Sequence, residues 1–125
     1  MIFGIGTDIV DLERIKAMKA PLAFAKKILG PDELPHFIAL REGQRLAYLG
    51  KQFAAKEAIV KAFGTGFRAP LFPQTIQILR DHSGKPEVVY SKEAKSYAES
   101  LGINKSHVSL CDERNHLIAF AILEG

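Results

Sequence analysis

Residues 42–63 are the segment that most constrains the fold of this chain, because it contains no proline and is followed by Gly64. Glycine readily adopts the left-handed conformation that closes many helices. At about 100° per residue around a helix, apolar residues lie on the side of Glu57 and also on the opposite side. The first set is Leu46, Gly50, Phe53, Ala54 and Val60, and the second is Tyr48, Ala55, Ile59 and Ala62. A helix that is apolar on two sides is buried, so we expect a long central helix here.

The flanking segments predict short helices and antiparallel strands. Residues 2–10 read as a strand, and Asp11 can cap a helix over residues 11–18. Two more short helices are expected, one opened by Pro21 and running to residue 29, and one over residues 33–40. The remainder predicts a hairpin over 75–79 and 86–90, a helix from Ser91 to about residue 101, and a second hairpin over 107–111 and 116–123. This order indicates an α+β fold with a small antiparallel sheet packed on the long central helix.

Length and composition predict one domain over residues 1–125, since 47% of the residues are hydrophobic and 25% are charged. No apolar run approaches the ~20 residues of a membrane helix. The first residues also lack the basic region and cleavage site of a signal peptide, so we expect a cytoplasmic protein without a membrane partner. The single cysteine, Cys111, cannot form an internal disulfide, and its apolar segment favours a buried side chain.

The net charge of +3 indicates an anionic partner, which could be a nucleic acid, a phosphorylated metabolite or an acidic protein. Charge alone does not choose among them. The sequence has no aromatic RNA-binding strand motif, no helix-turn-helix signature and no run of interleaved arginine and aromatic residues. We therefore expect no nucleic acid partner.

Two carboxylates stand where burial or strand structure disfavours them. Glu57 has apolar neighbours on its own helix face and needs a cation, and Asp8 lies inside the first strand. Lys61 is one candidate cation, although the same i, i+4 spacing is an ordinary helix-stabilising pair. Asp8 could equally face solvent or cap the next helix. As hard oxygen donors with no cysteine or histidine beside them, the two carboxylates suit Mg²⁺.

Lys61 leads into the loop Gly64-Thr65-Gly66, whose glycines allow backbone amides to approach a phosphate closely. The segment lacks the pattern of a P-loop. A glycine that closes a helix and leads into a turn predicts the same residues, so both interpretations stay open.

Five segments in order resemble the holo-acyl-carrier-protein synthase family of 4′-phosphopantetheinyl transferases. They are GIGTDIV (4–10), FAAKEA (53–58), KAFGTG (61–66), GKP (84–86) and HVSL (107–110). The match covers nearly the whole chain, and the pair GTDIV and FAAKEAxxKAFGTG is highly specific. The resemblance implies transfer of 4′-phosphopantetheine from coenzyme A to a serine of apo-acyl-carrier protein in fatty acid biosynthesis. The other product would be adenosine 3′,5′-bisphosphate, and the cofactor would be Mg²⁺. The family also implies a homotrimer with active sites at subunit boundaries.

Carried over residue by residue, the resemblance implies that Asp8 and Glu57 ligate Mg²⁺ and that these two residues and Lys61 are catalytic. Lys61 would contact the phosphates or help to activate the serine. Gly64, Thr65, Gly66 and His107 would border the coenzyme A site. The base that takes the serine proton stays open among Glu57, a water on the metal and Glu33.

Because carrier proteins of this kind are acidic, a basic docking surface is also expected, and Arg14, Lys26 and Lys27 can supply it.

One position departs from the family pattern, which usually has arginine immediately before Phe53, where this chain has Gln52. An amide cannot reproduce the two-pronged grip of a guanidinium on phosphate. We therefore expect Arg45 or Lys51 to compensate in binding coenzyme A, and Gln52→Arg to tighten that binding. The alternative is a non-catalytic subunit that keeps the fold and binds coenzyme A poorly.

Overall fold

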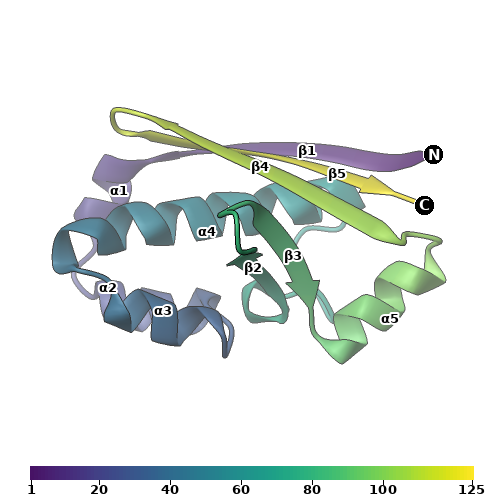
Figure 1. Cartoon of the computed structure of the whole chain (residues 1–125), viewed down its shortest axis with the longest axis horizontal. Helices are drawn as coiled ribbons and strands as arrows, with labels where there is room; N and C mark the ends of the chain where they lie inside the picture. Colours follow the sequence, from purple (N-terminus) through teal and green to yellow (C-terminus); the bar gives the residue numbers. More distant parts are fainter.

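The α+β prediction is confirmed by a computed structural model that describes all residues, 1–125. The strands are β1 (Ile2–Asp11), β2 (Ile76–Arg80), β3 (Pro86–Tyr90), β4 (Lys105–Glu113) and β5 (His116–Glu124). The helices are α1 (Leu12–Lys16), α2 (Pro21–Ile28), α3 (Glu33–Ala39), α4 (Glu42–Phe63) and α5 (Lys92–Ser100), with a 3₁₀ turn η1 (Pro73–Thr75). Figure 1 shows α4 lying along the sheet of β1, β4 and β5, with α2 and α3 on its other side. No helix is long and apolar enough to cross a membrane.

The central helix has the predicted bounds, and its ends follow from local chemistry. Gly64 closes α4 in the left-handed conformation, with φ of 80°, as predicted. Residues on both sides of α4 are buried, Ala54 and Val60 on the side of Glu57 and Ala55 and Ile59 on the opposite side. The first helix is shorter than predicted and ends at Lys16, and the Asp11 side chain accepts a hydrogen bond from the backbone of Glu13.

The three-stranded sheet has the order β1-β5-β4 with every pair antiparallel. Side chains alternate between its two faces. The inner face packs on α4 and is rich in alanine and leucine on β5, where Leu117, Ala119, Ala121 and Leu123 are at most 1% exposed. The small alanines allow the helix to lie close to the sheet.

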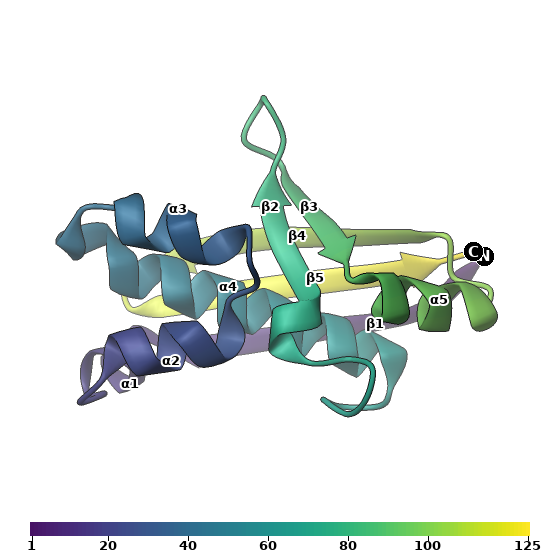
Figure 2. The same cartoon turned by 90° about the horizontal axis from the view of Figure 1, so that it is seen from below.

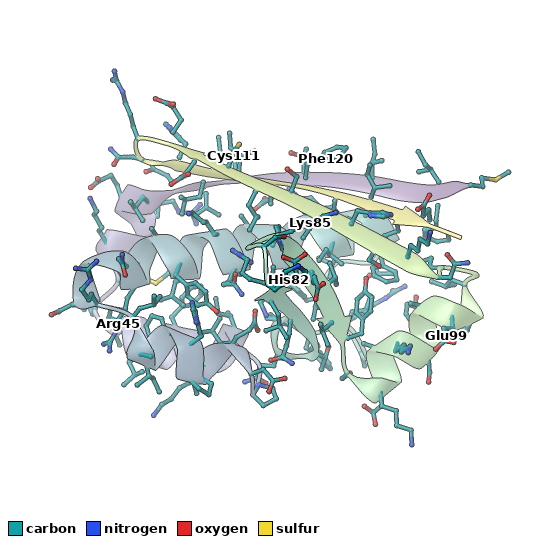
Figure 3. The ribbon with its side chains drawn as sticks, viewed as in Figure 1. Arg45, His82, Lys85, Glu99, Cys111 and Phe120 are labelled. Atoms are coloured by element: carbon teal, nitrogen blue, oxygen red, sulfur yellow. The ribbon has the colours of Figure 1, made fainter.

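The outer face of this sheet leaves apolar side chains in solvent. Ile5 and Ile9 on β1 are each 60% exposed, and Phe120 on β5 is 41% exposed. Figure 3 shows Cys111 and Phe120 on the side of the sheet away from α4. The prediction that Cys111 is buried is wrong: it is exposed, because the odd-numbered residues of β4 point away from the helix.

A buried ion pair joins the second layer to α4. Lys56 of α4 and Glu33 of α3 are both 0% exposed, and the Lys56 Nζ lies 2.6 Å from Glu33 Oε1. The same ammonium donates to the carbonyls of Pro73 and Ile76, each at 2.7 Å. Burial lowers the pKa of Lys56, while the charge and hydrogen bond of Glu33 act in the opposite direction. Three acceptors thus use all three donors of the ammonium, which allows its burial.

We expect Lys56→Met to lower the free energy of unfolding by about 3–5 kcal/mol, because it leaves the Glu33 carboxylate buried without its cation. Urea unfolding measures the change. Lys16→Met is the matched control, since Lys16 pairs with Glu13 at 3.5 Å in an exposed bridge. Its effect should stay within about 1 kcal/mol. Equal effects of the two substitutions would contradict a structural role for the buried pair.

Candidate active site

Two glycines let β1 lie directly against the backbone of α4. A Cβ built on Gly4 would overlap the carbonyl oxygen of Ala62, and one built on Gly6 would overlap that of Ala58. Two residues of a strand advance about 6.6 Å and four residues of a helix about 6 Å, so this contact can repeat along both elements. The next residue on the same face of β1 is Asp8.

Asp8 lies one step further along this contact, opposite the turn of Ala54 and Glu57, and the Lys61 side chain reaches back along α4 to meet it. The Lys61 Nζ lies 3.0 Å from Asp8 Oδ1 and also donates to the Thr7 carbonyl at 3.1 Å. The Asp8 side chain is 16% exposed, whereas that of Lys61 is 52% exposed. The predicted residues are therefore brought together from segments that lie 53 positions apart in the chain.

Glu57 lies one helical turn before Lys61 and is half-buried. Burial raises the pKa of Glu57, the negative charge of Asp8 raises it further, and Lys61 lowers it. The ion pair that Lys61 makes in the structure is with Asp8, so the ordinary helix pair with Glu57 is not the arrangement found. Glu57 and Asp8 thus share a single nearby ammonium.

The donor set of this cluster fits a Mg²⁺ ion that it shares with a substrate. No group of three or more histidine, cysteine, aspartate or glutamate side chains could hold a metal by itself. Mg²⁺ commonly takes one or two carboxylates and completes its shell with water and substrate phosphates. Asp8 and Glu57, close enough for Asp8 to shift the pKa of Glu57, match that requirement.

The loop Gly64-Thr65-Gly66 caps the C-terminal end of α4. The N–H groups of Gly64 and Thr65 donate to the Val60 carbonyl at 3.0 and 3.3 Å, so both are used by the helix end. The cap-and-turn interpretation is therefore confirmed for these two amides. Gly66 has a φ of 67° and open space where a Cβ would stand. The loop follows the C-terminus of α4, whose partial negative charge disfavours an anion. The positive charge of Lys61 in the last turn offsets it.

A second, basic group of side chains lines the edge of β4. A pocket of about 400 Å³ lies between α4, the hairpin and β4, and its cations are Lys51, Arg80 and Lys85. Lys51 lies 3.6 Å from Asp112 across this pocket. A neighbouring pocket of about 390 Å³ shares Lys85 and contains His107. We call these two pockets the β4 groove.

Sequence reasoning did not single out Lys85 and Arg80 as site residues, although the motif GKP contains Lys85. Their grouping depends on how the hairpin lies across α4.

The Asp8 cluster and the β4 groove lie on opposite edges of one sheet. Asp8 belongs to β1 and the groove to β4, with β5 between them. Asp8 is on the inner face, whereas His107 pairs in register with Ile122 and projects from the outer face. There its Nε2 lies 2.8 Å from Glu124 Oε1, a hydrogen bond that lowers the pKa of Glu124. Figure 2 shows the hairpin tip beyond β4, on the side away from β1. Within one chain, the structure does not bring His107 to Asp8.

The expectations for Glu33 and Gln52 are corrected by the structure. Glu33 cannot serve as a base, because it is wholly buried and its oxygens accept from Gly30, Lys56, Gln52 and Ile78. Gln52 is also 0% exposed, and its amide donates to Glu33 and to the Ile78 carbonyl at 2.8 Å. The expectation that residue 52 faces coenzyme A is therefore wrong, which removes the basis for Gln52→Arg and for a non-catalytic subunit.

Arg45 lies in neither the Asp8 cluster nor the β4 groove, so the structure does not support its expected role in binding coenzyme A. It caps α3 by donating to the carbonyls of Ile38 and Leu40 at 2.6 and 3.2 Å. It lies about 24 Å along the helix axis from Lys61, at about 1.5 Å per residue. Figure 3 shows it at the far end of α4.

The expected docking residues are all exposed. Arg14 lies in the last turn of α1, and Lys26 and Lys27 lie in the last turn of α2. Leu22, 49% exposed, adds an apolar side chain on α2. The surface therefore combines positive charge with a small apolar area.

Comparisons with known proteins agree over the whole chain. Residues 4–121 match the family described as the 4′-phosphopantetheinyl transferase superfamily. A holo-[acyl-carrier-protein] synthase of Methylibium petroleiphilum is 43% identical over 129 residues, covering 99% of this chain and 97% of the relative. The crystal structure of the synthase from Neisseria meningitidis superposes with a TM-score of 0.94 at 43% identity, covering 100% of both chains.

A synthase from Bacillus anthracis, solved in complex with coenzyme A (3′,5′-ADP), superposes with a TM-score of 0.83 at 31% identity, covering 100% of this chain and 98% of that one. The fold and these similarities thus define a phosphopantetheinyl transferase. Within that superfamily, the chain belongs to the holo-[acyl-carrier-protein] synthase family.

We expect Gly6→Ala to destabilise the protein by about 1–3 kcal/mol, because its methyl group must push β1 away from the α4 backbone. Gly43→Ala is the control, since no atom lies within 4 Å of a Cβ built there. On an exposed helix position, alanine should be neutral or stabilising by up to about 1 kcal/mol. Thermal and urea unfolding measure both variants, and a Gly6→Ala protein as stable as the wild type would contradict the close contact of β1 with α4.

Proposed function

We propose that this chain transfers 4′-phosphopantetheine from coenzyme A to a serine of apo-acyl-carrier protein, releasing adenosine 3′,5′-bisphosphate, in fatty acid biosynthesis. The observation that carries the proposal is the convergence of Asp8, Glu57 and Lys61 at the β1–α4 contact. A similarity over 99% of the chain to a holo-[acyl-carrier-protein] synthase supports the same reaction. A cytoplasmic location is part of the proposal.

Asp8 and Glu57 would hold Mg²⁺, which when bound neutralises and orients the pyrophosphate of coenzyme A. Lys61, at the same place, offsets negative charge that develops on the leaving phosphate. With Glu33 excluded by its burial, Glu57 and a water on the metal remain as candidates for the base that takes the serine proton. Catalysis here consists of placing charges and substrates rather than forming a covalent intermediate.

The β4 groove would bind the nucleotide part of coenzyme A. Its cations, Lys51, Arg80 and Lys85, have the charge that phosphate groups require, and Pro86 and Val108 add apolar surface. Because this groove and the Asp8 cluster lie on opposite edges of one sheet, a site that uses both must lie between two chains.

We therefore include a homotrimer in the proposal. The β1 edge of one subunit would meet the β4 edge of the next, and such a head-to-tail contact closes into a ring. The exposed outer face supports this arrangement, since Ile5, Ile9 and Phe120 leave a contiguous apolar surface in the single chain. Cys111 lies on the same face and would be covered in the assembly.

The partner protein would dock on Arg14, Lys26 and Lys27. An acidic carrier is attracted to this exposed basic surface, and charges of this kind act mainly on encounter and on salt dependence. The surface follows β1 in the chain, so a docked serine would approach from the side of the Asp8 cluster.

Asp8→Ala and Glu57→Ala should each reduce transfer by at least about 100-fold, because each removes one of two carboxylates that neutralise and place the metal. The readout is the mass of an apo-carrier protein after incubation with coenzyme A and Mg²⁺. Glu93→Ala, on the first turn of α5, is the control for loss of one carboxylate. Near-wild-type turnover in either test variant, with folding confirmed by circular dichroism, would show that the residue is not a metal ligand.

The shared site makes a separate prediction about mixed assemblies. Asp8→Ala and Lys85→Glu should each be inactive alone, but co-expressed chains should regain activity at about a quarter of the sites, where intact halves from two chains meet. Light scattering should give a mass three times the 13.8 kDa of one chain. If mixed assemblies stay as inactive as the separate variants, the site lies within one chain.

A further inference from the structure

Lys61 neutralises Asp8 in this structure. Its Nζ lies 3.0 Å from Asp8 Oδ1 and 3.1 Å from the Thr7 carbonyl oxygen, so two acceptors on neighbouring residues of β1 hold the ammonium. Two carboxylates, Asp8 and Glu57, thus share one resident cation at the place where the proposed function requires Mg²⁺.

The two partners of this ion pair differ in freedom. Asp8 has a short side chain on a paired strand and is 16% exposed, whereas the Lys61 side chain is long, flexible and 52% exposed. If the pair separates, Lys61 can move into solvent or toward a ligand while Asp8 stays in place. The pair therefore has one fixed member and one mobile member.

A divalent cation that binds Asp8 must approach an ammonium already in contact with it. The two positive charges repel each other, and the lysine must also give up its hydrogen bonds to Asp8 and Thr7. A pyrophosphate changes this balance, because it offers Lys61 another anionic partner and offers the metal further oxygen ligands.

From this geometry we propose that Lys61 is a resident counter-ion that competes with the metal for Asp8 until coenzyme A draws it away. The inference rests on the proposed function and adds a regulation of the same site. Metal and coenzyme A then bind cooperatively, and by linkage each raises the affinity for the other by the same factor. The free protein holds metal weakly, so the charged site is completed only together with its substrate.

The test measures Mn²⁺ binding by electron paramagnetic resonance of the free ion, with and without coenzyme A. The proteins are the wild type, Lys61→Met, the charge-conserving Lys61→Arg, and Lys92→Met as the control for net charge. Lys92 is exposed on α5, away from both groups of site residues.

Without coenzyme A, Lys61→Met should bind Mn²⁺ at least about fivefold more tightly than the wild type, while Lys61→Arg and Lys92→Met remain like the wild type. The gain in Mn²⁺ affinity on adding coenzyme A should shrink by a similar factor in Lys61→Met. Unchanged or weaker metal binding by Lys61→Met, including no detectable binding in either protein, overturns the inference.

Failure of the inference and failure of the proposed function give different results. If the wild type binds Mn²⁺ with coenzyme A and Asp8→Ala does not, the proposed metal site stands, and an unchanged Lys61→Met overturns only the role of Lys61 as a competitor. If no protein binds Mn²⁺ even with coenzyme A, the metal site of the proposed function is wrong and the inference fails with it.

Discussion

The close contact between β1 and α4 is the constraint on which the rest of the structure depends. Gly4 and Gly6 leave no room for a side chain between the strand and the carbonyl oxygens of Ala62 and Ala58. Because two strand residues and four helix residues advance by similar distances in opposite directions, the contact brings Asp8 to the turn of α4 that contains Glu57, and the Lys61 side chain reaches back to it along the helix. The packing that stabilises the sheet on its helix is therefore also what assembles the charged cluster.

The second layer depends on a different interaction, the buried pair of Lys56 and Glu33. The ammonium of Lys56 also joins α4 to the carbonyls of Pro73 and Ile76 at the start of the hairpin, so another side chain at this position would lose these contacts. Glu33 accepts from the backbone of Ile78 in the same hairpin at 3.0 Å. The hairpin in turn carries Arg80 and Lys85 to the β4 groove. Neighbouring residues of α4, Lys56 and Glu57, thus serve structure and the candidate site separately.

Features set by local sequence signals were predicted well, whereas features that depend on contacts between distant elements were not. The helix over residues 42–63 and the strand at 86–90 were predicted with their observed bounds, because proline, glycine and period-2 patterns are local signals. Cys111 was predicted to be buried from its apolar neighbours, yet it faces outward, since its facing depends on the register of β4 against β5. Gln52 was interpreted as a missing phosphate contact, whereas its partner Glu33 lies on another helix.

The sequence by itself determined the order of the elements, the central helix with its glycine cap, and the residue types of the charged cluster, because these follow from local patterns and from motifs with fixed spacing. Only the tertiary structure decided that Lys61 pairs with Asp8 instead of Glu57, and that Glu33 is a buried partner of Lys56 instead of a base. It also separated Asp8 from His107 by placing them on opposite edges and faces of one sheet. Such contacts join residues that are distant in sequence, and they depend on which face each element turns toward its neighbour, a property that no single segment encodes.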